Sequence, residues 1–280
     1  MTPEHLTYTH IGKTPIELSI YLGNKSNQQK KPTIYYIHGG GLIYGSRHDL
    51  PKEYIELLTS NGSDVVMLDY PLLPESTLDI ILNTLTSGIE FARHYLHQEN
   101  QPYLLFGRSA GAYLSVLLSS KYLTPKPIGV VSFYGYFDLS EMSLQQPSQH
   151  YNQYGLLPDM LVQNFIQKDI LANAPIEQRF PIYLSYRQRG TWVKQLLAPN
   201  LTLEDYSLDE DALASLPKLF IAASDTDQDV DISISKSLYE QTNHSTFVTV
   251  HDLSHDFDKN PKDSQAIQVY QDLKTWINDL

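Results

Sequence analysis

Short apolar runs alternate along the chain with longer segments in which apolar residues recur every three to four positions. Runs of this kind are typical of parallel strands covered on both faces, because neither face of such a strand meets water. The segments between them have the period of amphipathic helices. The pattern predicts strands at 33–37, 65–68, 103–106, 128–133, 219–223 and 246–250. Two earlier runs, 6–11 and 16–22, turn at Gly12-Lys13 and predict an antiparallel pair at an edge of the sheet.

Turn and cap residues indicate where the helices begin and end. One helix is expected to begin near Asp49-Pro51 and to stop near Asn61-Gly62. A second is expected to begin in a capping box at Ser76–Asp79 and to run as far as Leu96. The closing helix is expected at 266–280. This alternation predicts an α/β fold with a mostly parallel central sheet and helices on both of its faces.

The pattern changes between Asp138 and Pro217. This stretch is rich in glutamine, tyrosine and proline, and only short pieces such as Leu157–Ile166 have a helical pattern. It interrupts two predicted strands near the ends at which open α/β sheets bind their ligands. We therefore expect one domain over residues 1–280 with a helical cap inserted at about 139–216. An insertion that packs away from the ligand crevice is the alternative.

The composition of the chain excludes several classes of function. The chain has 280 residues and no cysteine, which excludes thiol nucleophiles, disulfides and cysteine-ligated zinc and is compatible with the cytoplasm. Its first ten residues lack the cationic stretch and apolar run of a signal peptide, and no run is long enough to span a membrane. A net charge of −12 would repel nucleic acid and anionic lipid. We expect a cytoplasmic protein that acts on a small molecule.

A serine lies at a predicted corner between a strand and a helix. Ser109 stands in Gly107-Arg108-Ser109-Ala110-Gly111, directly after the strand at 103–106 and before a helix-like apolar segment. Glycine on both sides permits a turn too tight for side chains, which is the sequence form of a nucleophile elbow. Because a single motif of this length also occurs by chance, it needs support from elsewhere in the chain.

That support is a glycine loop upstream. His38-Gly39-Gly40-Gly41 directly follows the strand at 33–37, so backbone amides without a neighbouring Cβ are expected beside the strand ends. Such amides can bind the oxyanion that forms during acyl transfer. An ordinary glycine-rich turn is the alternative. A phosphate-binding loop is excluded because Ser46-Arg47 stand where that motif needs lysine and serine or threonine.

An activated serine also needs a base and an acid, which follow it in the order Ser, Asp or Glu, His on this kind of fold. Histidines 251 and 255 follow the last predicted strand, and four aspartates follow the strand before it: Asp225, Asp227, Asp229 and Asp231. The spacing of the aspartates does not fit a calcium loop, because Val230 and Lys236 stand where glycine and glutamate are needed. The two histidines lack the HExxH pattern of a zinc site. We expect no metal and no cofactor.

Three segments together resemble a known family. His38–Gly41, Asp69–Glu75 and Gly107–Gly111 are similar in sequence and order to landmarks of the hormone-sensitive-lipase-like esterases, a carboxylesterase branch of the α/β-hydrolase superfamily. The chain departs from the family pattern at Arg108, where an acidic residue is usual, and at Pro71, where arginine is usual. The resemblance implies the α/β-hydrolase fold.

The resemblance also implies a choice among the crowded acids and histidines. In the family, two residues separate the catalytic acid from a small residue that follows the strand. With Ser224 as the small residue, this spacing selects Asp227, and Asp229 is the alternative. In the family, one residue separates the catalytic histidine from a phenylalanine. This pattern selects His255, because Phe257 follows it at that spacing. The expected catalytic residues are therefore Ser109, Asp227 and His255.

The implied activity is that of a serine carboxylesterase acting on small esters through an acyl-enzyme intermediate. The amides of Gly40, Gly41 and Ala110 are the expected oxyanion donors. Two other classes stay open: a serine peptidase or acyltransferase that uses the same three side chains, and an inactive homologue that binds a small molecule.

Overall fold

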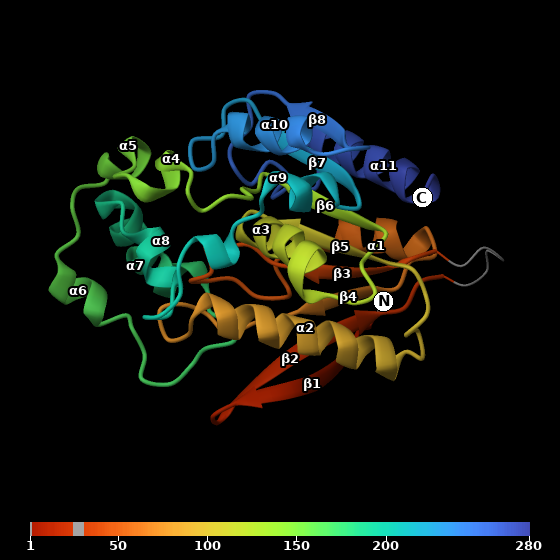
Figure 1. Cartoon of the computed structure of the whole chain (residues 1–280), viewed down its shortest axis with the longest axis horizontal. Coiled ribbons are helices and arrows are strands. Elements are labelled where there is room, and N and C mark those ends of the chain that lie inside the picture. The colour runs from red at the N-terminus through yellow and green to blue at the C-terminus, as the bar shows by residue number, and fades with distance from the viewer. Residues whose placement is uncertain (1, 25–30) are drawn as a thin grey trace.

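The computed structural model describes residues 2–24 and 31–280. Within them the strands form one eight-stranded sheet in the order β1-β2-β4-β3-β5-β6-β7-β8 (Figure 1). The first two strands pair antiparallel, β2 pairs antiparallel with β4, and all the remaining pairs are parallel. The strands are β1 (Glu4–Ile11), β2 (Thr14–Tyr21), β3 (Thr33–Ile37), β4 (Val65–Leu68), β5 (Tyr103–Arg108), β6 (Gly129–Phe133), β7 (Lys218–Ser224) and β8 (Thr246–Val250). The expected fold class is confirmed.

Helices cover both faces of the sheet. The chief ones are α1 (Lys52–Ser60), α2 (Leu78–Tyr95), α3 (Ala110–Leu117), α10 (Ile232–Gln241) and α11 (Ser264–Asn278), and a π-helical turn, η1 (Leu118–Tyr122), extends α3. Alternate residues of β3 enter two different cores, because successive side chains of a strand point to opposite faces. Tyr35 packs with the helices α2, α3 and α10, whereas Tyr36 packs with α1 and α11.

Two local predictions differ from the structure. The strand expected at 103–106 continues to Arg108, because Gly107 and Arg108 still pair with Ser132 and Phe133 of β6. This extension carries Ser109 to the carboxyl edge of the sheet. The capping box predicted at Ser76–Asp79 is wrong: α2 begins at Leu78 with Thr77 as its N-cap, and the Thr77 side chain makes no capping hydrogen bond.

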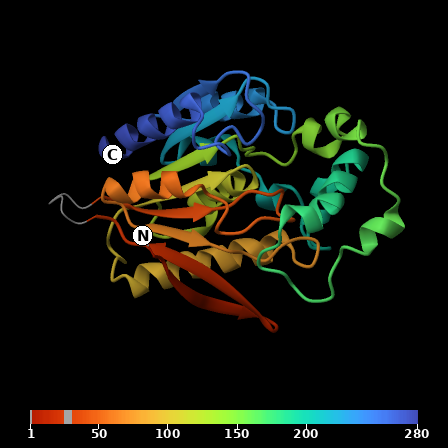
Figure 2. The ribbon, with the colours of Figure 1, turned by 180° about the vertical axis from the view of Figure 1, so that it is seen from behind.

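The segment between β6 and β7 forms short helices around one long one. They are α4 (Met142–Gln145), α5 (Gln149–Asn152), α6 (Asp159–Gln163), α7 (Ile176–Arg189), α8 (Trp192–Leu196), η2 (Glu204–Tyr206) and α9 (Glu210–Ala214). The longest, α7, ends at Gly190, which has a φ of 62° and closes the helix in the left-handed conformation that glycine favours. Figures 1 and 2 show α4 to α8 together at one end of the molecule, away from both termini. We refer to residues 139–216 as the insertion.

Candidate active site

Ser109 occupies a strained turn between β5 and α3. Its φ is 52° and its ψ is −120°, a conformation that side-chain-bearing residues seldom adopt and that is found at functional turns. A Cβ on Gly107 would lie 2.0 Å from the carbonyl oxygen of Gly111, and one on Gly111 would lie 2.1 Å from that of Ile37. Both flanking positions therefore require glycine, as the elbow motif predicts.

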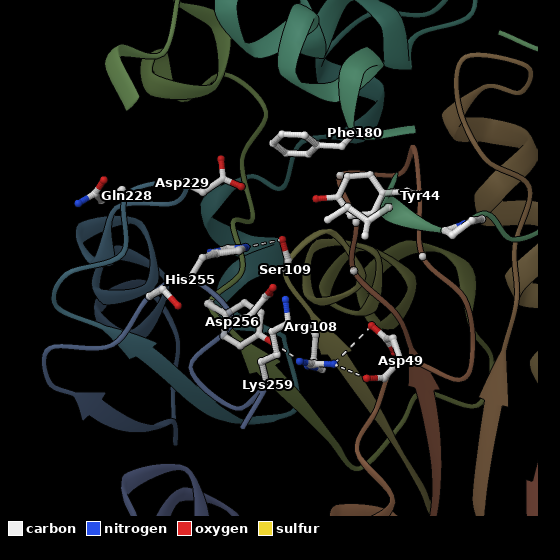
Figure 3. Close-up of a pocket in the computed structure, with 18 of the residues that line it drawn as sticks. Tyr44, Asp49, Arg108, Ser109, Phe180, Gln228, Asp229, His255, Asp256 and Lys259 are labelled. Atoms are coloured by element: carbon white, nitrogen blue, oxygen red, sulfur yellow. Dashed lines mark hydrogen bonds and ion pairs between the residues drawn. The ribbon is translucent and has the colours of Figure 1, made fainter. Parts of the chain in front are cut away.

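The structure brings the three predicted side chains together. His255 Nε2 lies 2.8 Å from Ser109 Oγ (Figure 3). His255 Nδ1 lies 2.6 Å from Asp227 Oδ2. The other carboxylate oxygen of Asp227 accepts hydrogen bonds from the backbone N–H groups of Asp229, at 2.9 Å, and Val230, at 3.0 Å. With Nδ1–H bonded to Asp227, Nε2 of a neutral imidazole can accept the serine proton.

The surroundings of His255 favour its protonated form. Burial lowers the pKa of the imidazole, but the Asp227 carboxylate and its hydrogen bond outweigh burial, and Asp229 and Asp256 add to their effect. Together they raise the pKa of His255 from 6.5 to about 9. The ring of Tyr134 packs edge-on against the imidazole at 4.8 Å between centroids. An imidazolium formed by proton transfer from Ser109 would be stabilised by this arrangement.

The glycine loop lies beside the same serine. Gly40 and Gly41 have φ values of 93° and 58° and line the pocket that contains Ser109. Ala110 is the first residue of α3, so its amide lies among the free N–H groups of a helix start. In the described part of the chain, the N–H groups of Gly40, Gly41 and Ala110 donate to no acceptor. All three amides are free to bind a ligand.

The remaining aspartates each have another partner. Asp225 pairs with His251 at 2.6 Å, and both side chains are well exposed. Asp231 caps α10 by accepting from the N–H of Ser233. Asp229 accepts from Tyr183 and Arg187 of the insertion and makes no hydrogen bond to His255 within the described residues. The geometry thus pairs Asp227 with His255 and not Asp229, the alternative that the sequence left open.

Arg108, which departs from the family pattern, forms a buried network behind the elbow. Its Nη2 lies 2.7 Å from Asp258, and its Nε donates to the hydroxyl of Tyr134. Asp258 is fully buried and also accepts from the hydroxyls of Tyr134 and Tyr270. Asp258 follows His255 by three residues, so this network ties the histidine loop to the end of β5. No motif or periodicity marks this pairing, which joins residues 150 positions apart.

A pocket of about 960 Å³ opens at Ser109. The glycine loop and the residues after it, the elbow, and the loops after β7 and β8 form part of its wall, and the insertion contributes residues that include Tyr151 and Phe180. Figure 3 shows Phe180 and Tyr44 facing the same space as Ser109 and His255. Tyr44 packs edge-on against Phe180 at 6.4 Å between ring centroids. Sequence analysis assigned neither aromatic residue to the site, because tyrosine-rich segments are as typical of packing as of pockets.

The insertion also contacts the glycine loop from behind. The indole N–H of Trp192, in α8, donates to the carbonyl oxygen of Gly41 at 3.0 Å. The ring of Tyr183, in α7, packs so closely on Gly41 that a Cβ there would lie 2.3 Å from a ring carbon. Glycine is therefore required at 41 by both its backbone conformation and this contact.

Among the described helices, none is both long and apolar enough to cross a bilayer.

Comparison with known proteins gives the family. Residues 34–259 match the family model described as the alpha/beta hydrolase fold, and the chain belongs to that family. An alpha/beta hydrolase superfamily protein from Enterococcus faecalis is 31% identical, covers 99% of each chain and superposes with a TM-score of 0.86. A protein of unknown function from Staphylococcus aureus is 30% identical, with a TM-score of 0.90 over 99% of this chain and 98% of that one.

More distant similarities are to the fold of an esterase and to a short segment of a synthase sequence. Carboxyl esterase 2 of the fungus Tuber melanosporum is 18% identical, with a TM-score of 0.69 over 99% of this chain and 87% of the esterase. A non-reducing polyketide synthase of Penicillium roqueforti is 29% identical over 168 residues, which are 53% of this chain. The match spans only 7% of the length of the synthase. At these levels the esterase likeness concerns the fold.

Proposed function

We propose that the protein is a serine carboxylesterase that hydrolyses small esters through an acyl-enzyme intermediate. The single observation that carries the proposal is the continuous array of Ser109 Oγ, His255 and Asp227, joined by contacts of 2.8 and 2.6 Å, in which Ser109 and His255 line a pocket. Membership of a hydrolase family and the esterase fold neighbours support the same reaction class.

In the first half of the reaction, Ser109 Oγ attacks the ester carbonyl carbon while its proton passes to His255 Nε2. The carbonyl π electrons move to oxygen, and the free amides of Gly40, Gly41 and Ala110 stabilise the resulting oxyanion. The oxyanion then collapses, the bond to the alcohol oxygen breaks, and the imidazolium returns its proton to that alcohol. Ser109 is left acylated.

In the second half, water attacks the acyl carbonyl and gives its proton to His255. Collapse of the second tetrahedral intermediate releases the carboxylic acid and restores the Ser109 hydroxyl with the proton held by His255. Asp227 keeps the Nδ1–H tautomer throughout and stabilises the positive ring. No cofactor enters these steps.

The insertion supplies the part of the pocket that faces the substituents of the ester. Phe180 and Tyr44 offer aromatic surface over Ser109, which favours small apolar groups. We include in the proposal that the insertion acts as the cap of a single hydrolase domain.

The test is covalent labelling with a small fluorophosphonate, followed by peptide mapping and by assay with p-nitrophenyl acetate. We expect the label on Ser109. Folded Ser109→Ala should not be labelled, and its kcat should fall by about 10⁶-fold, as when the nucleophilic serine of a serine protease is removed. Ser254→Ala, which removes a hydroxyl from the same pocket wall, is the matched control and should keep labelling. Turnover retained by Ser109→Ala would place the nucleophile elsewhere and refute the proposal.

Hydrolysis of p-nitrophenyl acetate compared with the matching p-nitroanilide separates an esterase from a peptidase. We expect the ester to be turned over and the anilide to be left essentially intact.

A further inference from the structure

Asp229 connects the insertion to the loop that carries Asp227. The hydroxyl of Tyr183 lies 3.0 and 2.9 Å from the two carboxylate oxygens of Asp229. Arg187, one helical turn further along α7, places Nη1 3.2 Å from Asp229 Oδ1 and donates from Nη2 to the Asp229 carbonyl oxygen at 3.1 Å. Two side chains of one helix thus hold both the side chain and the backbone of Asp229. We call Tyr183, Arg187 and Asp229 the α7 clamp.

The other side of Asp229 faces the active site. Its backbone N–H donates to Asp227 Oδ1 at 2.9 Å, and Asp227 Oδ2 receives His255 Nδ1 at 2.6 Å. These bonds fix the rotation of the Asp227 carboxylate together with the Val230 N–H, which also donates to Oδ1 at 3.0 Å. A shift of Asp229 would therefore turn the carboxylate that orients His255. The chain of contacts runs from α7 through Asp229 and Asp227 to the imidazole.

The clamp is built into the interior. The Arg187 side chain is 3% exposed, and its guanidinium lies 5.7 to 5.9 Å from the ring centres of Tyr151, Tyr183 and Trp192. Burial raises the pKa of the Asp229 carboxyl, but Arg187, His255 and hydrogen bonds from Tyr183 and Tyr151 together hold it below its usual value. A buried guanidinium is costly unless a carboxylate compensates it, so the pair fixes the position of both groups.

We propose that Tyr183 and Arg187 are positioning residues of the hydrolase, which act through Asp229 to keep Asp227 aligned with His255. This inference rests on the roles proposed for Ser109, Asp227 and His255. It makes the insertion a structural part of the catalytic array as well as a wall of the pocket. Asp229 lines the pocket, whereas Tyr183 and Arg187 lie behind that lining.

The position of the clamp residues determines the kinetic signature. Because Tyr183 and Arg187 do not line the pocket, their loss should lower kcat and leave the KM for a small ester nearly unchanged. A displacement of a catalytic group by about 1 Å can cost about 10²-fold in rate. We expect Arg187→Met to lower kcat for p-nitrophenyl acetate by about that factor, and Arg187→Lys, which keeps a cation near Asp229, to lose less.

The matched control is Arg189→Met. Arg189 lies two residues further on the same helix, and its guanidinium pairs with the exposed Asp159 instead of Asp229. Both variants remove one cation from α7, and we expect the kcat of Arg189→Met to equal that of the unmodified enzyme. Tyr183→Phe and Tyr186→Phe form a second pair that removes one hydroxyl each, and only the former should lower kcat. If Arg187→Met does not fold, the two tyrosine variants still test whether the α7 clamp positions Asp227.

The double variant Arg187→Met with Asp227→Asn separates positioning from general destabilisation. Residues that act through one another are not additive, so the double variant should be no slower than Asp227→Asn alone. Additive losses, or equal kcat for Arg187→Met and Arg189→Met, would overturn the clamp. An unmodified enzyme that fails to label at Ser109 would instead overturn the proposed function, so the two failures are distinguishable.

Discussion

The loops at the carboxyl ends of the strands and the insertion between β6 and β7 contribute to the same pocket in different ways. The loops carry the groups proposed to react, and each lies a few residues beyond a strand: Gly40 and Gly41 after β3, Ser109 after β5, Asp227 after β7 and His255 after β8. The insertion carries groups that hold or surround them, such as Trp192, Arg187 and Phe180. In the proposed mechanism, the reacting groups therefore belong to the loops at the strand ends, and their alignment depends on the insertion.

This comparison predicts that substitutions in the loops have larger effects than substitutions in the insertion. The largest effect after loss of Ser109 itself is expected at Asp227. Asp227→Asn should lower kcat by about 10⁴-fold, because the amide can hold the imidazole in the wrong tautomer. His255→Gln should be impaired at least as severely, since it removes the base.

The second His–Asp pair of the chain is the natural control. Asp225 and His251 are joined at the same 2.6 Å but are exposed and make no contact with Ser109 among the described residues. Asp225→Asn and His251→Gln should keep near-normal kcat once their unfolding temperatures have been checked. Severe loss in this pair together with normal rates at Asp227 and His255 would reverse the assignment.

The next effect concerns stability and tests the contact between the elbow and the histidine loop. Arg108→Met would leave the fully buried Asp258 without its cation, which typically costs about 3–5 kcal/mol of unfolding free energy. Urea unfolding should show this loss. Adding Asp258→Asn should restore part of it, because the uncompensated charge is then removed.

Arg93→Met is the control for removal of a buried arginine. Arg93 is buried but donates to the carbonyl oxygens of Glu99 and Gln101 and has no buried carboxylate partner in the described part of the chain. Its loss should therefore cost less than that of Arg108. Equal losses at the two positions would show that the Arg108–Asp258 charge pair is not what ties the histidine loop to β5.

The fold and the candidate site differ in how much of each could be predicted from the sequence. The strands and Ser109 were predictable because each depends on a local pattern: an apolar run, or glycines around a tight turn. The order of the chain narrowed the acid and the base to a few aspartates and two histidines, and the family resemblance selected Asp227 and His255 among them. The pairings of Arg108 with Asp258, and of Arg187 with Asp229, join residues 150 and 42 positions apart, and no periodicity marks them. A cap was expected from the position of the insertion, but its contacts with Asp229 and Gly41 come from helices packed against the core, and no sequence pattern marks those contacts.

The pH dependence provides a smaller and more graded test of the loops. His255 must be neutral to accept the serine proton, so kcat/KM should rise about tenfold per pH unit and level off near pH 9, the pKa of His255 in the folded protein. Its raised pKa also adds stability that is fully present below pH 6.5 and lost as the pH rises through about 9.

The groups facing His255 predict how this profile changes. Asp227, Asp229 and Asp256 raise the pKa of His255, and of these Asp256 is exposed and not hydrogen-bonded to the imidazole in the described residues. Asp256→Asn should therefore move the midpoint to lower pH while kcat at the plateau stays close to normal. A profile that is already flat from pH 6 upward in the unmodified enzyme would show that the carboxylates do not raise the pKa as proposed.

The smallest expected effect lies in the insertion, at the contact between Trp192 and the glycine loop. Trp192→Phe keeps most of the ring packing but removes the indole N–H that donates to Gly41 at 3.0 Å. Leaving the Gly41 carbonyl oxygen without its donor costs about 1–3 kcal/mol of unfolding free energy. The glycine loop should then hold the oxyanion donors less firmly in place. We expect kcat for p-nitrophenyl acetate to fall about tenfold, well below the loss at Asp227.

The other tryptophan of the chain serves as its control. Trp276 packs in α11 against Phe220, on the face of the sheet away from the insertion, and Trp276→Phe should change the unfolding temperature without changing kcat. If Trp192→Phe and Trp276→Phe had equal kcat values, Trp192 would only pack the insertion. A loss at Trp192 as large as that at Asp227 would contradict the division between groups that react and groups that align them. The expected loss at Trp192, smaller than that at Asp227 but larger than that at Trp276, would support the division. An aligning contact changes the position of the oxyanion donors but removes none of them.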